Sequence, residues 1–148
     1  MDAHIEGVRV AESPSGVVAV VTLGAEGETD VLPIFVGCEE AASIARGLDA
    51  TDIGRPLTHD LLLDVMEELG GRVDGVVVSG IDDGTYIADL HVDTPRETVV
   101  VDARPSDSLA LAARTNVGIE IERDVFDAGR EPVEDFSGLE DIREMIGA

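Results

Sequence analysis

Apolar and β-branched residues gather in short runs along this 148-residue chain, and turns rich in Gly, Pro and Asp separate the runs. Such runs favour β-strands, because branched side chains fit a pleated and half-buried surface. The turn "DDG" at 82–84 is typical of a hairpin between two neighbouring strands. The pattern predicts strands at 4–11, 17–23, 30–36, 73–80, 85–93, 98–103 and 117–122.

Apolar residues at helical spacing predict three helices, which begin near Glu39, His59 and Asp107. The middle helix spans 58–70 and ends at a pair of glycines, which favour helix termination. Its apolar stripe consists of Leu62, Val65, Met66 and Leu69.

The segment 127–148 forms an acidic C-terminal tail that Pro and Gly interrupt. It ends in "SGLEDIREMIG", where Ser137 and Glu140 match a capping box at the start of a short helix. The apolar stripe of this helix is narrow. The helix could dock on the domain or fray, and we expect it to dock.

The chain also matches itself without gaps at an offset of 68 residues. In the aligned segments 4–47 and 72–115, eight of 44 positions are identical, among them Arg46 with Arg114. Two merely similar units would also produce this match, but the shared order of strand, strand, strand and helix favours a duplication. We therefore predict one α+β domain at 1–126, with a mainly antiparallel or mixed sheet and packed helices.

The charge of the chain is far from balanced, because 32 acidic residues face ten basic ones and give a net charge of −22. All ten basic residues are arginine, and lysine, normally a common residue, is absent. This composition resembles that of cytoplasmic proteins from extreme halophiles, where molar salt shortens the Debye length to about 3 Å and screens self-repulsion. The charge therefore indicates habitat more than partners, although it disfavours the basic contacts that usually bind nucleic acid.

Several classes of protein are disfavoured by what the sequence lacks. No apolar run approaches the roughly 20 residues that span a bilayer, and the N-terminus has no signal-peptide pattern. We expect a cytoplasmic protein with no membrane partner. Cys38 is the single cysteine and has no base near it in sequence, so a small buried hydrophobe is favoured over a nucleophile.

Two stretches share one formula of Arg-Pro, a hydroxyl residue, an acid and an apolar run: "RPLTHDLLLD" at 55–64 and "ARPSDSLAL" at 103–111. In ordinary helix-start chemistry, the hydroxyl residue is the N-cap, the acid faces the positive end of the helix dipole, and the arginine pairs with the acid. The hydroxyl residues are Thr58 and Ser106, the acids are Asp60 and Asp107, and the arginines are Arg55 and Arg104.

The same formula would also suit an anion site. Helix N-termini present free backbone N–H groups, and a nearby arginine adds a charge suited to phosphate. Acids beside that site could hold a divalent metal, and His59 could move a proton. The spacing alone favours the helix-start interpretation, because each ingredient is ordinary there.

Two further acidic patterns are candidates for chemistry. Asp102 ends the strand "VVVD" just before a loop and a helix, a common place for functional side chains. Its counterpart in the first repeat is Ile34, so a duplication does not account for the acid. In "DLHVD", Asp89, His91 and Asp93 share one strand face, where a solvated surface is favoured over a metal site.

Together these stretches resemble the bifunctional nuclease family. The resemblance rests on "VLPIFVG" followed by Glu40, on "RPLTHDLL", on the hairpin "GVVV…DDGTYIADL" and on "VDARPSDSLALA", and it spans 5–125 with the motifs in the family's order. It implies an α+β fold, a nuclease activity on RNA and DNA that some members show, and a homo-oligomer, a dimer or larger. The matching polar positions are Glu40, Arg55, Thr58, His59, Asp60, Asp102, Arg104, Ser106 and Asp107.

We adopt the interpretation of a nuclease that depends on Mg²⁺ or Mn²⁺, in which carboxylates hold the metal, arginines clamp the phosphate and a histidine moves the proton. The alternative is a non-catalytic oligomeric module that binds a ligand or a protein, which the net charge and the missing metal signature favour. In the nuclease interpretation the catalytic residues are His59, Asp60, Asp102 and Asp107, the substrate-binding residues are Arg55, Thr58, Arg104 and Ser106, and the metal ligands are Asp102, Asp107 and Glu40.

Overall fold

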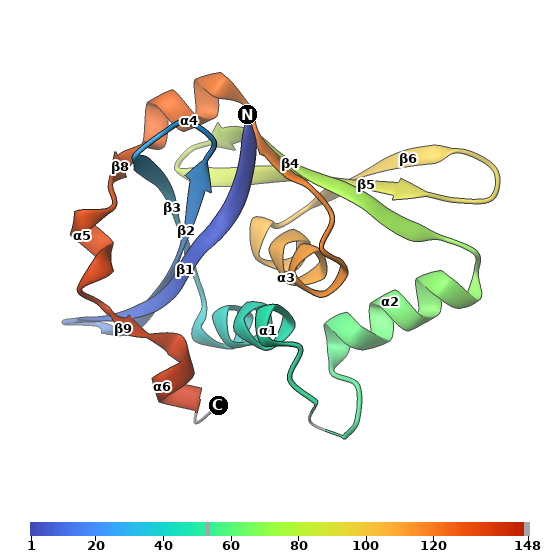
Figure 1. Cartoon of the computed structure of the whole chain (residues 1–148), viewed down its shortest axis with the longest axis horizontal. Coiled ribbons are helices and arrows are strands. Elements are labelled where there is room, and N and C mark those ends of the chain that lie inside the picture. Colours follow the sequence, from blue (N-terminus) through green and yellow to red (C-terminus); the bar gives the residue numbers. More distant parts are fainter. Residues whose placement is uncertain (53, 147–148) are drawn as a thin grey trace.

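The computed structural model describes residues 1–52 and 54–146, and it shows a curved sheet with the helices Cys38–Asp49 and Pro105–Thr115 on one face and the short helix Glu134–Ser137 on the other (Figure 1). The strands are β1 (Asp2–Ser13), β2 (Gly16–Ala25), β3 (Asp30–Val36), β4 (Arg72–Asp82), β5 (Thr85–Asp93), β6 (Thr98–Ala103), β7 (Ile119–Ile121), β8 (Glu131–Pro132) and β9 (Glu140–Asp141). The helices are α1 (Cys38–Asp49), α2 (Thr58–Glu68), α3 (Pro105–Thr115), α4 (Arg123–Gly129), α5 (Glu134–Ser137) and α6 (Ile142–Ile146). Within the two described ranges, none of these helices is long and apolar enough to cross a bilayer.

The strands form one mixed sheet in the order β6-β5-β4-β7-β1-β2-β3-β8, and β9 pairs with β1 outside this path. The pair of β4 and β7 is parallel, whereas the hairpin pairs are antiparallel. The predicted α+β class is therefore confirmed. The predicted strands also match closely, because β-branched runs and turn residues fix both their cores and their ends.

The two halves of the chain have the same connection. Two antiparallel meanders, β1-β2-β3 and β4-β5-β6, each lead into a helix, and β7 lies between β1 and β4. The first strand of each meander shifts register just before a glycine, between Ile5 and Gly7 in β1 and between Val73 and Gly75 in β4. These bulges correspond at the offset of 68 residues and support a duplication, while the superposition of the two halves stays a prediction.

Small residues allow α1 and α3 to pack closely on the sheet (Figure 1). Ala41 and Ala45 of α1 and Ala110 of α3 are fully buried. A Cβ atom added at Gly47 would lie 3.0 Å from the Cβ of Ala113, so a larger residue there would push the helices apart. The alanine-rich sequence of both helices therefore sets how closely their polar side chains approach one another.

The starts of α2 and α3 differ from the predicted ones. The N-caps are Leu57 and Arg104, both with extended backbone, so the predictions of Thr58 and Ser106 as caps are wrong. Pro105 takes the first helical position of α3, which suits proline because an N–H there would have no partner within the helix. The hydroxyl groups of Thr58 and Ser106 therefore do not cap these helices.

The C-terminal segment docks on the domain, as predicted, but the predicted capping box is wrong, because Ser137 ends α5, Glu140 lies in β9 and the helix α6 begins at Ile142. Its β9 strand pairs with β1, and the side chains of Phe136 and Ile142 are buried. Arg143 adds an ion pair, with its Nε 2.8 Å from Oδ2 of Asp49 at the end of α1. These contacts hold α6 beside α1, where it contributes to the cavity described next.

Candidate functional site

The first turns of α1, α2 and α3 meet at a cavity of about 670 Å³, here called the His59 cavity. Helix N-termini carry free N–H groups and the positive end of the helix dipole, so this convergence suits an anion. The helix-start residues around it are Cys38, Glu39, Glu40, Thr58, His59, Arg104 and Asp107, and α6 adds Ile142, Met145 and Ile146.

The His59 side chain links the three helices. Its Nδ1 lies 2.7 Å from Oγ of Ser43 in α1, and its Nε2 lies 2.9 Å from Oδ1 of Asp107 in α3. The histidine side chain is only 13% exposed, so both hydrogen bonds are largely shielded from water. The arrangement fixes the orientation of the ring at the wall of the cavity.

Arg104 and Asp107 form the more open part of the same wall. Nε of Arg104 donates to Oδ2 of Asp107 at 3.1 Å, and 69% of the arginine side chain stays exposed. Burial raises the pKa of the Asp107 carboxyl, but hydrogen bonds from His59 and Arg104 outweigh burial and hold this pKa below its usual value. Asp107 is therefore an anion that orients His59, and Arg104 is a largely exposed cation beside it.

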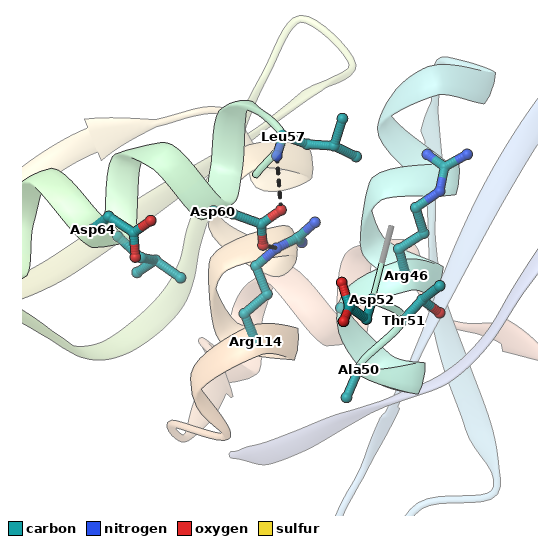
Figure 2. Close-up of a pocket in the computed structure, with 10 residues that line it drawn as sticks. Arg46, Ala50, Thr51, Asp52, Leu57, Asp60, Asp64 and Arg114 are labelled. Carbon is teal, nitrogen blue, oxygen red and sulfur yellow. Dashed lines mark hydrogen bonds and ion pairs between the residues drawn. The ribbon is translucent and has the colours of Figure 1, made fainter. Parts of the chain in front are cut away.

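Arg114 connects the helices through a neighbouring cavity of about 400 Å³ (Figure 2). Its Nε lies 2.7 Å from Oδ1 of Asp60, and its other nitrogens donate to the carbonyls of Ser43 and Ala110 at 3.0 Å and to Oγ of Ser43 at 3.2 Å. The second Asp60 oxygen accepts from the Leu57 N–H at 3.0 Å. Burial raises the pKa of Asp60, but its bonds with Arg114 and Leu57 lower it more.

A third cavity, of about 320 Å³, adjoins the His59 cavity and is here called the Phe35 cavity. Arg104 and Glu40 line both spaces, so the two cavities are adjacent at these side chains. Phe35 is 64% exposed, which is unusual for a phenylalanine, and Tyr86 lies in the same lining. An exposed aromatic face beside a cation, as Phe35 presents here, is typical of sites that stack nucleobases.

The structure brings together five of the predicted site residues at the His59 cavity: Glu40, Thr58, His59, Arg104 and Asp107. Asp60 instead binds Arg114 in the neighbouring cavity, and Ser106 is buried in the lining of the Phe35 cavity. Arg55 is exposed ahead of α2 and is not among the described residues around these cavities.

Asp102 lies apart from the other predicted residues. It is opposite Asp89 in the pairing of β5 and β6, and directly opposed residues share one face of a sheet. Asp89 alternates with the buried Ala88 and Leu90, so both acids point away from the packed face of the sheet. The position of Asp102 at the end of a strand therefore did not mean that its side chain points into the cavity.

The predicted metal ligands Asp102, Asp107 and Glu40 do not form a preassembled cation site. In the described ranges, no group of three or more His, Cys, Asp or Glu residues has the arrangement needed to hold a metal ion. Asp107 directs one oxygen to a histidine and the other to an arginine, and Asp60 is similarly engaged. The residues present therefore do not fit a resident Mg²⁺ or Mn²⁺ ion, and we derive no step through one.

Two important residues were missed by the sequence reasoning. Ser43 sits inside α1, outside every recognised motif, and Arg114 sits at the far end of α3. A signal for Arg114 existed, because it is identical to Arg46 in the aligned repeat. Arg46 lines both the His59 cavity and the neighbouring one, and no ion pair involves it in the part of the chain that the structure describes.

A histidine held between a serine and an aspartate at the wall of an open cavity, with arginines beside it, is an arrangement suited to hydrolytic chemistry on an anionic substrate. Comparison of the sequence with known protein families identifies the family to which the chain belongs. The family described as "Bifunctional nuclease domain" matches residues 21–134. The chain belongs to this family.

Three relatives illustrate the similarity. The uncharacterized proteins MT1877 and Rv1829, from two strains of Mycobacterium tuberculosis, are each 38% identical over 124 residues, which cover 84% of this chain and 73% of each relative. Bifunctional nuclease 2 of Oryza sativa subsp. japonica is 26% identical over 108 residues, which cover 71% of this chain and 33% of the relative. The domain is thus shared with a rice protein that is about three times as long as the matched part.

Proposed function

We propose that the protein is a nuclease that hydrolyses phosphodiester bonds of RNA or DNA in the His59 cavity. The observation that carries this proposal is the position of His59 and Arg104 side by side where three helices begin. Arg104 contributes an exposed guanidinium that can bind two phosphate oxygens at once, and the helix N-termini add N–H donors. Family membership supports the same activity.

Because the chain is strongly negative, binding of a nucleic acid depends on the few arginines at the cavity. With a net charge of −22, long-range attraction of a polyanion is unfavourable, so close contacts have to supply the binding. Arg46 lines the His59 cavity, and no ion pair to it is formed by the residues described in the structure. Together with Arg104 it would give the cavity two cations for one phosphate group.

The Phe35 cavity supports a single-stranded substrate. A phosphate bound at Arg104 would place the adjacent base beside Phe35 and Tyr86, because Arg104 lines both cavities. An aromatic face stacks on any base, with a contribution of about 1–3 kcal/mol per base. A base inside a duplex would not reach such a face without leaving its stack.

Replacement of Arg104 with alanine is expected to lower cleavage of single-stranded RNA or DNA by about 100-fold, since it removes one charged donor to the phosphate. Stability should change by less than about 1 kcal/mol, because the ion pair of Arg104 is largely exposed. The measurement is cleavage of a labelled oligonucleotide in molar KCl, with Mg²⁺, Mn²⁺ or EDTA. The EDTA arm tests the predicted requirement for a divalent metal.

The matched control is Arg96→Ala, which removes the same charge at the exposed turn between β5 and β6. It should cleave like the wild type. Equal activity of the wild type and Arg104→Ala would contradict the site assignment and indicate a contaminating nuclease, so all variants should be purified in parallel. Absence of cleavage by the wild type would contradict the proposed function itself.

A second candidate function, an oligomeric binding module, is favoured by α2. This helix buries none of its residues: Leu61, Leu62 and Val65 are 54%, 43% and 46% exposed, and Leu69 at the C-cap is 74% exposed. Contiguous exposed apolar side chains typically mark an interface. We propose that a second copy of the chain covers this face, which is compatible with either function.

Replacement of both Leu62 and Leu69 with serine is therefore expected to convert a dimer or larger oligomer into a monomer. The measurement is light scattering coupled to size-exclusion chromatography in molar KCl. Ile81→Ser is the control, because Ile81 is similarly exposed at 47% but lies at the end of β4. A wild type with the mass of one chain would show that α2 is not a self-association surface.

A further inference from the structure

The two hydrogen bonds of the His59 ring determine which of its nitrogens can accept a proton. Asp107 is ionised, so its oxygens only accept hydrogen bonds, and the proton shared with it must belong to Nε2 of His59. In the neutral ring, Nδ1 then carries the lone pair and accepts the hydroxyl proton of Ser43, whose Oγ lies 2.7 Å away. Both ring nitrogens are thus engaged, and the single basic atom of the ring faces a serine and not water.

Ser43 has the other features of an activated nucleophile. Its Oγ accepts a hydrogen bond from Nη2 of Arg114 at 3.2 Å while it donates to His59. The guanidinium would stabilise negative charge on this oxygen, and residue Ser43, at 8% exposure, lies in a shielded environment where such charges interact strongly. Ser43 also lines the His59 cavity, so a substrate bound there can reach it.

We infer that Ser43 is the nucleophile of the reaction, with His59 as its general base and Asp107 as the residue that orients the histidine. This inference rests on the proposed nuclease function and deepens it, because it makes cleavage a two-step process through a phosphoserine diester. Arg104 binds the phosphate beside these residues. Asp107 is a poor alternative base, because its hydrogen bonds to His59 and Arg104 stabilise the ionised form.

The step balances without a cofactor. The Ser43 oxygen attacks the phosphorus, and its proton passes to Nδ1 of His59, which becomes an imidazolium beside the Asp107 carboxylate. The bond from phosphorus to the departing sugar oxygen breaks on the side opposite Ser43, and that oxygen takes a proton from solvent. Water then attacks the phosphoserine from the opposite side and releases a proton to solvent, and His59 returns its proton to Ser43 as the ester bond breaks.

The experiment combines cleavage with covalent labelling of the intact protein in molar KCl. Ser43→Ala and His59→Gln should each lower oligonucleotide cleavage by about 1,000-fold or more, and the double variant should be no worse than either, because the residues act as a unit. Diisopropyl fluorophosphate, a small phosphorylating probe, should label the wild type on Ser43, as located by peptide mass spectrometry. Ser108→Ala is the control, because this buried serine of α3 has no hydrogen-bond partner in the described structure and should keep wild-type cleavage and labelling.

The outcomes separate this inference from the proposed function. Cleavage by a folded Ser43→Ala variant at the wild-type rate would overturn the nucleophile while the nuclease stands. Labelling of Ser43 in a wild type that cleaves no nucleic acid would support the nucleophile and contradict the nuclease. If Ser43→Ala does not fold, the labelling of the wild type decides, and an unlabelled Ser43 overturns the inference.

Discussion

Replacement of Arg114 with alanine is expected to destabilise the protein by about 1.5–3 kcal/mol, because it removes the hydrogen bonds of a largely buried guanidinium to Asp60 and Ser43. The Arg114 side chain is only 9% exposed and joins α3 to both α1 and α2. Its loss would remove the cation beside the Asp60 carboxylate and the donor to Oγ of Ser43. Urea denaturation at constant salt would measure the change in the free energy of unfolding.

Arg104→Ala is the matched control for this measurement, because it removes an arginine that is also paired with an aspartate but is 69% exposed. Its free energy of unfolding should change by less than about 1 kcal/mol. An equal loss in both variants would show that burial does not distinguish the two pairs.

The effect of Arg114→Ala should also depend on pH. The folded-state pKa of Asp60 is lowered, so its contribution to stability is present above the unfolded value of about 3.9 and is lost as the pH falls through the folded value. The difference in stability between the wild type and the variant should therefore shrink below about pH 4. A difference that stays constant from neutral to acidic pH would mean that the ionised pair is not its source.

The second large effect is expected from salt. The thermal midpoint should rise as KCl increases from millimolar to molar levels, because a charge of −22 repels itself within a small folded surface and salt screens this repulsion. For a chain of this length, each kcal/mol gained raises the midpoint by roughly 2–4 °C. A stabilisation of a few kcal/mol would therefore be visible in a single series of thermal melts.

A variant with fewer charges provides the control. Replacement of the exposed tail acids with their amides would reduce the repulsion and should weaken the dependence of the midpoint on KCl. A wild-type midpoint that is flat or falls with KCl would contradict the halophilic interpretation of the composition. The residues to replace are Glu131, Glu134, Asp135 and Glu140.

The sequence was a reliable guide to the strands and a poorer guide to what the helices face. Strand positions follow from β-branched runs, since such runs favour one backbone conformation over all others. The stripe of α2 was also recognised, but Leu62, Val65 and Leu69 face solvent while Leu63 and Met66 pack towards the core. Periodicity shows that a helix has an apolar side and does not show whether that side meets its own chain or another.

The candidate site was predictable only where the residues stand at helix starts. His59, Arg104 and Asp107 belong to such starts, and their convergence depends on how closely α1 and α3 pack. Ser43 carries no local signal, because a serine inside a helix becomes a ligand of His59 only through contacts between helices. Asp102 was predicted to belong to the site because it lies beside a loop. The alternation of side chains along the strand instead directs it away from the packed face of the sheet.

Because α2 has no fully buried residues, this helix is expected to unfold locally more easily than the rest of the domain. The helix is held mainly by His59 and Asp60 at its first turn and by the partly buried Leu63 and Met66. Local unfolding of α2 should therefore cost much less free energy than global unfolding, and each opening withdraws His59 from Ser43. A second copy bound to the apolar face would close this equilibrium by mass action, so turnover per chain would rise with protein concentration.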